Sequence, residues 1–247
     1  MFLITGVAGF IGYHVANRLL NCGQQVCGID NVNSSYSPRV KYARLERLRG
    51  RPGFEMIEAN IMSEADWRIR SLRPGVVIHL AAQAGVRESL DNPQQSVDDN
   101  VVGFLKVLEF CRQAGVQHLV YASTSAVYGS NTPLPWREDD NVDNPVSLYA
   151  ATKKANELMA HVYSAVHGLR TTGLRFFTVY GPYGRPDMAI FKFTRALFRQ
   201  EPIQLFNHGL MSRDFTYVED IVNGILSVTQ RSGDLYKVYN IGSGVQT

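Results

Sequence analysis

Residues 2–12 read Phe2-Leu3-Ile4-Thr5-Gly6-Val7-Ala8-Gly9-Phe10-Ile11-Gly12, a short apolar run that leads into three glycines and a helical pattern. Glycine permits a tight turn and lets the backbone approach a pyrophosphate, which the free N–H groups at the helix start can bind. A strand, a glycine turn and a helix in this order are typical of dinucleotide-binding folds. This stretch therefore predicts a phosphate-binding loop at Gly6, Gly9 and Gly12.

The pattern that begins there continues along the chain. Apolar runs typical of strands occur at 2–4, 25–29, 54–57, 76–79, 118–122 and 171–175, and helical patterns at 10–21, 38–49, 64–71, 93–113 and 147–166. Alternating strands and helices predict parallel strands joined by right-handed crossovers. We therefore expect an α/β fold with a Rossmann-like, doubly wound parallel sheet.

The regular alternation of strand and helix patterns ends after about residue 178. The remaining sequence predicts loops with a helix at 190–199, short strands at 203–206 and 215–216, and a helix at 218–230. We therefore expect a Rossmann domain over residues 1–178 and a smaller, C-terminal substrate-binding lobe over 179–247. A strand at 238–241 and a turn at 242–244 directly precede Thr247, so we also expect that this lobe is truncated.

Composition narrows the class of protein. The 247 residues are 45% hydrophobic and carry a net charge of +3, which is ordinary for a globular protein and gives no sign of a nucleic-acid partner. The three cysteines show no metal-ligand spacing, alone or with the histidines, so we expect no metal site. We see neither a signal peptide nor a membrane helix, and therefore predict a cytoplasmic protein.

Polar residues follow the next two strands. Asp30 ends the second strand, where a carboxylate would bind ribose hydroxyls and repel a 2′-phosphate, which favours NAD over NADP. The alternative is that Asp30 only begins a turn with Asn31 and Asn33. Asn60-Ile61 closes the third strand, where the amide could bond the adenine edge, although asparagine is also an ordinary loop residue.

The stretch Tyr149-Ala150-Ala151-Thr152-Lys153 supplies a candidate acid/base. Residues four apart on a helix share a face, so the Tyr149 hydroxyl and the Lys153 ammonium can point into one pocket. A nearby cation favours the phenolate and would lower the pKa of Tyr149 toward the range of a proton-transfer catalyst. The same spacing also arises by chance on many helices, so the pair needs support from other parts of the chain.

That support comes from blocks that follow the glycine loop in order: His79-Leu80-Ala81-Ala82, Asn100, Ser123-Thr124-Ser125-Ala126-Val127-Tyr128-Gly129, Tyr149 and Lys153. With them, the chain resembles the extended short-chain dehydrogenase/reductase family, in its NAD-dependent epimerase/dehydratase branch, over essentially its whole length. Three further blocks, at 83–87, 148–160 and 175–182, are similar to UDP-glucuronate 4-epimerases.

The resemblance implies roles for the matching residues. Thr124 aligns with the residue that hydrogen-bonds the reacting sugar hydroxyl, Tyr149 with the base and Lys153 with its electrostatic partner. The predicted NAD contacts are Gly6, Gly9, Phe10, Ile11, Gly12, Asp30, Asn31, Asn60, Ile61, Leu80, Ala81, Ala82, Asn100, Ser123, Tyr149, Lys153 and Phe177. The predicted contacts to a UDP-sugar include Thr178, Arg213 at the diphosphate, and Gln204 to Phe206 beside the uracil.

Two departures from the family pattern matter. Most relatives place aspartate where Asn60 stands, which puts adenine binding in doubt. The family also continues for several helices and strands beyond the end of this chain. A catalytically impaired NAD-binding fragment is therefore one alternative to an active enzyme.

The implied reaction is inversion at C4 of a UDP-hexuronic acid, UDP-glucuronate to UDP-galacturonate. Bound NAD⁺ takes a hydride from C4 while Tyr149 removes the hydroxyl proton, and the hydride returns to the other face of a 4-keto sugar. Hydrogen-bond donors that hold the C5 carboxylate would oppose its loss as CO₂. Candidates for this role are Ser125, Thr178, Arg87 and Arg185.

Two questions stay open. Dehydratases and decarboxylases of this branch carry acidic residues after the catalytic Ser/Thr, whereas this chain has Ser125 and Ala126, which favours simple epimerisation. A UDP-glucose/galactose-type epimerase acting on a neutral sugar remains an alternative. The resemblance also implies a homodimer through a helix pair and a role in surface polysaccharide synthesis. Met159 and Tyr163 lie on an apolar face that suits either this contact or burial in the core.

Overall fold

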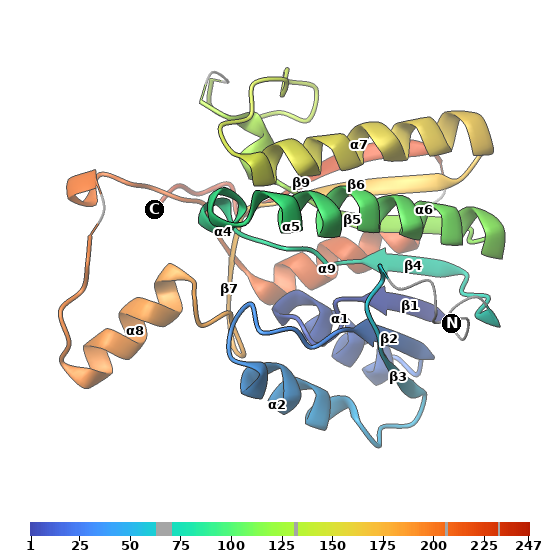
Figure 1. Ribbon diagram of the computed structural model, residues 1–247, viewed down its shortest axis with the longest axis horizontal. Helices are drawn as coiled ribbons and strands as arrows, with labels where there is room; N and C mark the ends of the chain where they lie inside the picture. The colour runs from blue at the N-terminus through green and yellow to red at the C-terminus, as the bar shows by residue number, and fades with distance from the viewer. Residues whose placement is uncertain (63–70, 131–132, 206, 232) are drawn as a thin grey trace.

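The computed structural model describes residues 1–62, 71–130, 133–205, 207–231 and 233–247. Within these ranges, seven parallel strands form one sheet in the order β3-β2-β1-β4-β5-β6-β9 (Figure 1). They are β1 (Phe2–Thr5), β2 (Val26–Asp30), β3 (Phe54–Glu58), β4 (Val76–His79), β5 (His118–Thr124), β6 (Arg170–Phe176) and β9 (Tyr236–Ile241). The chain winds outward from β1 to β3 and then returns to build the other half, which confirms the doubly wound sheet.

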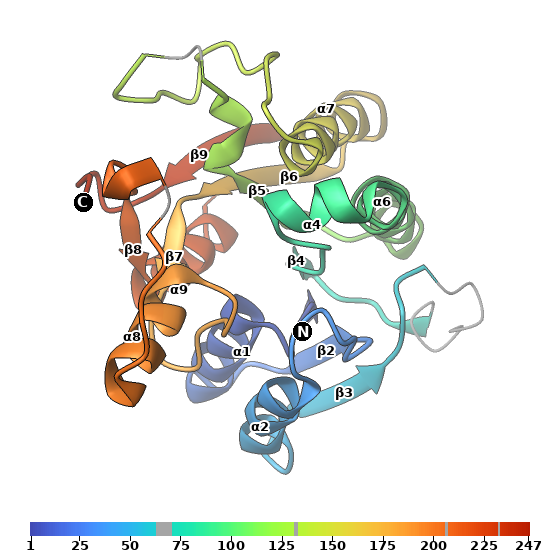
Figure 2. The same ribbon diagram turned by 60° about the vertical axis from the view of Figure 1, so that its left-hand side comes forward.

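Helices cover both faces of this sheet (Figure 2). One face carries α1 (Phe10–Asn21), α2 (Pro38–Leu48) and α9 (Val218–Thr229), and the other carries α6 (Gly103–Ala114) and α7 (Leu148–His167). Alternate residues of a strand point to opposite faces, so Leu3 packs in the core under α6 and α7 while Ile4 packs in the core under α1 and α9. Both side chains are buried, as expected for a parallel strand.

Shorter elements surround the carboxyl edge of the sheet. The helix predicted over 93–113 is observed as α5 (Pro93–Val97), a π-helical turn η1 (Asp98–Val102) and α6. The helix α4 (Val86–Asp91) and the 3₁₀ turns η2 (Ser125–Tyr128) and η3 (Asn207–Gly209) were not predicted. The strands β7 (Thr178–Tyr180) and β8 (Phe215–Tyr217) pair in a separate two-stranded sheet, and α8 (Ala189–Arg199) lies apart from the large sheet (Figure 1).

The structure contradicts one predicted strand and leaves other predicted elements untested. Residues 203–205 are not in a strand, and Phe206 lies outside the described residues, as do 64–70 of the helix predicted over 64–71. The strand predicted at 238–241 is β9, which pairs with β6 in the large sheet. The division at residue 178 stays a prediction. No helix in the described ranges is long and apolar enough to span a membrane.

Candidate active site

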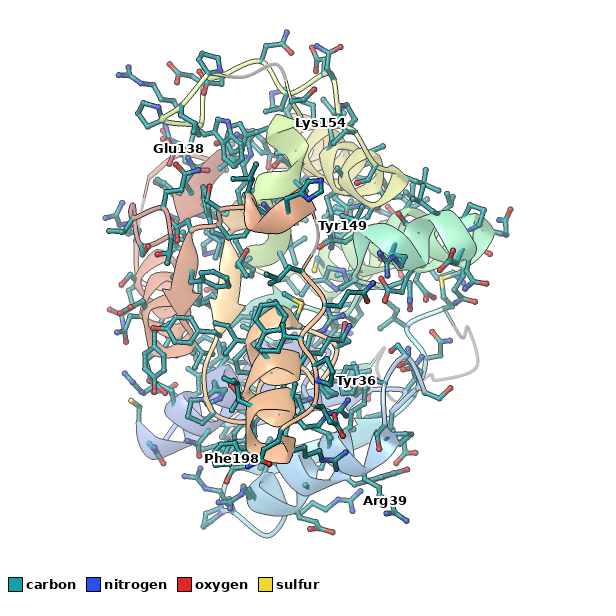
Figure 3. The ribbon with its side chains drawn as sticks, turned by 90° about the vertical axis from the view of Figure 1, so that its left-hand side faces the viewer. Tyr36, Arg39, Glu138, Tyr149, Lys154 and Phe198 are labelled. Carbon is teal, nitrogen blue, oxygen red and sulfur yellow. The ribbon has the colours of Figure 1, made fainter. Side chains whose placement is uncertain are left out.

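A cleft of about 1750 Å³ runs along the carboxyl ends of the parallel strands and is bounded on its far side by α8. Ligands of doubly wound sheets bind at this edge. The predicted site residues that line the cleft are Gly6, Gly9, Phe10, Ile11, Gly12, Asp30, Asn31, Asn60, Ile61, Leu80, Ala81, Ala82, Arg87, Ser123, Thr124, Ser125, Tyr149, Lys153, Phe177, Thr178, Arg185, Gln204 and Arg213. Figure 3 looks onto this side of the molecule, with Tyr149 and Tyr36 labelled beside α8.

The glycine loop has the close packing that a phosphate loop needs. Gly6 has φ +74°, and a Cβ there would lie 2.7 Å from the backbone nitrogen of Ala81. A Cβ on Gly12 would lie 2.2 Å from the carbonyl oxygen of Gly6. No side chain caps the start of α1, so the N–H groups of its first turn are available to an anion. The loop therefore fits a dinucleotide pyrophosphate.

Asp30 serves both interpretations that the sequence left open. One carboxylate oxygen accepts from the backbone N–H of Val32 at 2.8 Å, as in an Asx turn, and the other accepts from that of Ala8 at 3.0 Å. The Ala8 bond fixes the carboxylate against the glycine loop. A carboxylate has about four acceptor sites, so two remain for ribose hydroxyls in the cleft.

Asn60 is committed to a local turn. Its side-chain oxygen accepts from the backbone N–H of Met62 at 2.9 Å. The oxygen keeps one acceptor site, and the amide NH₂ adds donors that an aspartate at this position would lack.

The start of α7 brings Tyr149 to Thr124. Ser147 caps this helix by accepting from the backbone N–H of Ala150 at 3.1 Å, and the N–H of Tyr149 donates to Ser89 Oγ at 3.1 Å. The Tyr149 side chain lies beside that of Thr124, which lowers the pKa of Tyr149, and both residues line the cleft. The two predicted catalytic hydroxyls, from α7 and from the end of β5, therefore meet in the cleft.

Burial dominates the electrostatics of this pair. Loss of solvent raises the pKa of Tyr149, and the charge of Arg185 together with the Thr124 hydrogen bond oppose this rise only in part. Lys153 is 2% exposed and donates to the carbonyl oxygen of Ala122 at 3.1 Å, and burial lowers its pKa to about 8. The sequence predicted that Lys153 lowers the pKa of Tyr149. In the structure the pKa of Tyr149 is raised overall, and Arg185 is the cation that opposes this rise.

Two predicted cofactor residues support the wall of the cleft. Asn100 is buried behind the lining residues, where its amide exchanges two hydrogen bonds with the backbone of Gln83, at 2.8 and 3.0 Å. Ser123 donates to Glu157 at 2.6 Å, and Glu157 forms a buried bidentate pair with Arg175, both contacts at 2.9 Å. Sequence reasoning missed the roles of Glu157 and Arg175, because a buried ion pair between a helix and a strand leaves no local pattern.

The two arginines predicted to bind the substrate carboxylate, Arg185 and Arg87, differ in their surroundings. Arg185 makes a bidentate pair with Asp187, at 2.6 and 3.1 Å, and also donates to the carbonyl oxygen of Ala84 at 3.4 Å. These bonds use Nε and Nη2, so among the described residues Nη1 has no hydrogen-bond partner and can donate to a ligand. Arg87 is exposed at the rim. Asp187 was not predicted, although its position two residues after Arg185 is a usable signal.

Comparisons with known proteins agree with this geometry. Residues 2–242 match the model of the NAD dependent epimerase/dehydratase family. The chain is 48% identical to a probable UDP-glucuronate 4-epimerase of Rhizobium meliloti (strain 1021), over 92% of this chain and 67% of that protein. The crystal structure of UDP-glucuronic acid 4-epimerase from Bacillus cereus, in complex with UDP-glucuronic acid and NAD, has a TM-score of 0.92 and 33% identity, and covers 100% of this chain and 78% of its own.

A UDP-glucose 4-epimerase from Thermotoga maritima, solved with UDP-glucose, is also similar, with a TM-score of 0.88 and 31% identity over 100% of this chain and 78% of that chain. The predicted family, fold and NAD cofactor are thereby confirmed. This chain belongs to the NAD dependent epimerase/dehydratase family.

Proposed function

We propose that this protein is a UDP-glucuronate 4-epimerase that forms UDP-galacturonate. The observation that carries the proposal is one cleft lined by the glycine loop, by the neighbouring side chains of Tyr149 and Thr124, and by Arg185. The first feature suits NAD, the second suits proton transfer at a sugar hydroxyl, and the third suits a uronate carboxylate.

The cofactor would be held by the glycine loop and Asp30, with the Lys153 ammonium on the ribose side. NAD, when bound there, supplies the hydride acceptor and donor that oxidises and then reduces C4. The backbone N–H groups at the start of α1 would donate hydrogen bonds to its pyrophosphate, and Asp30 would accept hydrogen bonds from its ribose hydroxyls. The bond from Ala8 to Asp30 holds these two anchors at a constant separation.

Tyr149 would take the proton of the sugar 4-hydroxyl and return it after the sugar has turned. Thr124 holds the same hydroxyl through its own oxygen, which keeps the proton path short. The pKa of Lys153 is about 8, so at pH 7 it is mostly protonated, and the charge that lowers the pKa of Tyr149 is that of Arg185.

Arg185 would bind the carboxylate of the substrate through Nη1. A fixed charge-assisted hydrogen bond keeps that carboxylate from reaching the desolvated state in which it loses CO₂ most easily. One observation favours the alternative, a neutral sugar: Asp187 already neutralises Arg185, so the cleft holds no uncompensated cation at this position.

The test is to incubate the purified chain and NAD⁺ with UDP-glucuronate or UDP-glucose and follow the products by NMR. We expect UDP-galacturonate, and we expect Tyr149→Phe to lower kcat by about a thousandfold, the size of a lost general base. Tyr163→Phe is the matched control, because Tyr163 lies on the same helix and donates to Glu109. Turnover of UDP-glucose alone would select the neutral-sugar alternative, and loss of CO₂ to a pentose product would contradict simple epimerisation.

We also propose a homodimer through α6 and α7. Leu105 of α6 and Leu158, Val162 and Val166 of α7 expose 41–68% of their surface, so the two helices present an apolar face that a second copy could cover. Met159 and Tyr163, for which the sequence left burial and a dimer contact open, pack against the core beneath α7. Light scattering should show a dimer that Leu158→Glu converts to a monomer, while Leu197→Glu on α8 leaves it intact.

A further inference from the structure

The turn before Arg185 has an unusual backbone. Gly181 has φ +148° and Tyr183 has φ +58°, a region that residues with a side chain rarely adopt. Within this turn, in the described part of the chain, a single backbone hydrogen bond runs from the N–H of Gly184 to the carbonyl oxygen of Gly181, at 3.1 Å. A turn with a strained residue and little internal bonding needs outside contacts to keep one shape.

Those contacts come from the two helices beside the glycine loop. The three carbonyl oxygens of residues 182–184 all face side chains from α1 and α2. His14 Nε2 is 2.8 Å from the carbonyl oxygen of Pro182. Arg44 donates to Tyr183 through Nη2 at 2.7 Å and Nε at 3.1 Å, and to Gly184 through Nη2 at 3.3 Å.

Arg44 also contacts the glycine loop, where the cofactor would bind. Its Nη1 donates to the carbonyl oxygen of Ala8 in the glycine loop at 2.9 Å and to the Tyr36 hydroxyl at 2.6 Å. The guanidinium of Arg185 in turn lies 6.0 Å from the centre of the Tyr36 ring. Arg44 is 0% exposed, so no part of its charge is left to water. It therefore joins the glycine loop, Tyr36 and the turn before Arg185.

We propose that Arg44 is a positioning residue that sets the guanidinium of Arg185, and so determines the preference for a uronate over a neutral sugar. The inference rests on the proposed function, because it takes the carboxylate of the substrate as the ligand of Arg185. Arg44 is not among the residues that line the cleft, and its hydrogen bonds reach neither Tyr149 nor Thr124. It acts by holding the turn that carries Arg185 against the loop that carries the cofactor.

Lysine cannot replace arginine in this role. The planar guanidinium presents five N–H groups in a fixed fork, and here they reach four separate acceptors. An ammonium keeps the charge but gathers its three donors at one point. Arg44→Lys therefore separates the charge of Arg44 from its geometry.

The experiment compares Arg44→Lys with the control Arg51→Lys. Arg51 donates its side-chain hydrogen bonds to Asn17 and Asn21 of α1 rather than to the turn. We expect Arg44→Lys to raise the KM for UDP-glucuronate about tenfold, the effect of one misplaced charge-assisted hydrogen bond, while the KM for UDP-glucose changes less than about twofold. An equal rise for both sugars, or the same rise in Arg51→Lys, would overturn the inference.

A double-mutant cycle separates positioning from a general structural effect. If Arg44 acts through Arg185, then Arg44→Lys should add little to the KM of an Arg185→Gln protein. Purely additive effects would show that Arg44 works independently of Arg185.

Failure of the proposed function would be visible separately, as absence of UDP-glucuronate turnover in the unmodified chain. The positioning claim then has its own readout, a crystal structure of Arg44→Lys that needs no substrate. We expect Arg185 to leave Asp187 and Ala84 in that structure. An unmoved Arg185 would refute the inference whatever the substrate is.

Discussion

The two walls of the cleft differ in how firmly they are built. On the sheet side, Asn100, Ser123, Lys153 and Glu157 are at most 3% exposed, and each makes hydrogen bonds at 3.1 Å or less. On the other side, α8 contains no buried residue and exposes 87% of Phe198 (Figure 3). The groups proposed for chemistry are thus fixed by folding itself, whereas α8 contributes little to the core. Substitutions of buried residues on the sheet side should therefore change the stability of the fold, whereas substitutions on α8 should leave it almost unchanged.

The largest effect is expected from Glu157→Gln, which breaks the buried pair with Arg175. Removing one partner leaves a guanidinium without its counter-charge in the core, so we expect a loss of about 3 kcal/mol in the free energy of unfolding. Chemical denaturation measures it. The control is Asp234→Asn, whose partner Lys237 is exposed, and which should show no measurable loss. Equal losses in both variants would mean that the sheet wall is no firmer than the surface.

Lys153→Met should stabilise the fold while abolishing activity. The pKa of Lys153 falls from 10.5 to about 8 on folding, so its burial in the charged form costs about 2 to 3 kcal/mol at pH 7. Below pH 8 this cost is complete, and it disappears as the pH rises from about 8 to 10.5. The stability gap between the variant and the unmodified chain should close over that window. The neighbour Lys154, which pairs with exposed Asp143, supplies the control Lys154→Met, for which a constant gap is expected.

A smaller effect is expected from Asp187→Asn. The substitution removes the negative charge that neutralises Arg185 but keeps an acceptor for its N–H groups. The KM for UDP-glucuronate should fall about fivefold, or ~1 kcal/mol, while that for UDP-glucose stays constant. Because the charge of Arg185 lowers the pKa of Tyr149, the acid limb of the rate profile should also move to lower pH. Steady-state kinetics across pH test both, and a rise in KM for both sugars would contradict the role given to Asp187.

Phe198→Ser should have the smallest effect. Its side chain is almost fully exposed, so its replacement should change the free energy of unfolding by less than about 0.5 kcal/mol. Thermal denaturation measures this, and lower binding of an apolar dye would show that α8 is the exposed apolar surface. A loss above about 1 kcal/mol would mean that α8 packs more tightly than its exposure indicates.

The difference between local order and long-range contacts explains how much of the fold and the site could be predicted from the sequence. Gly6, Asp30 and Tyr149 were predicted from local order, at strand ends or in one helical turn, and all three line the cleft. Arg44 was not predicted, because in the sequence it is one of several basic residues of an amphipathic helix, and its partners are far along the chain. The place of β9 beside β6 also depends on long-range pairing, which leaves no signal in a short window.

The pairing of α1 with α9 has a consequence for biosynthesis. The apolar side chains Val15 and Leu19 of α1 pack in the core that Val222 and Ile225 of α9 complete. The 196 residues between Asn21 and Val218 must be made before this cover exists. At about 5–20 residues per second, the ribosome needs about 10–40 s for that stretch. During this time the first helix offers an uncovered apolar face, so a nascent chain of this protein is a natural client for chaperones that shield such surfaces until synthesis reaches α9.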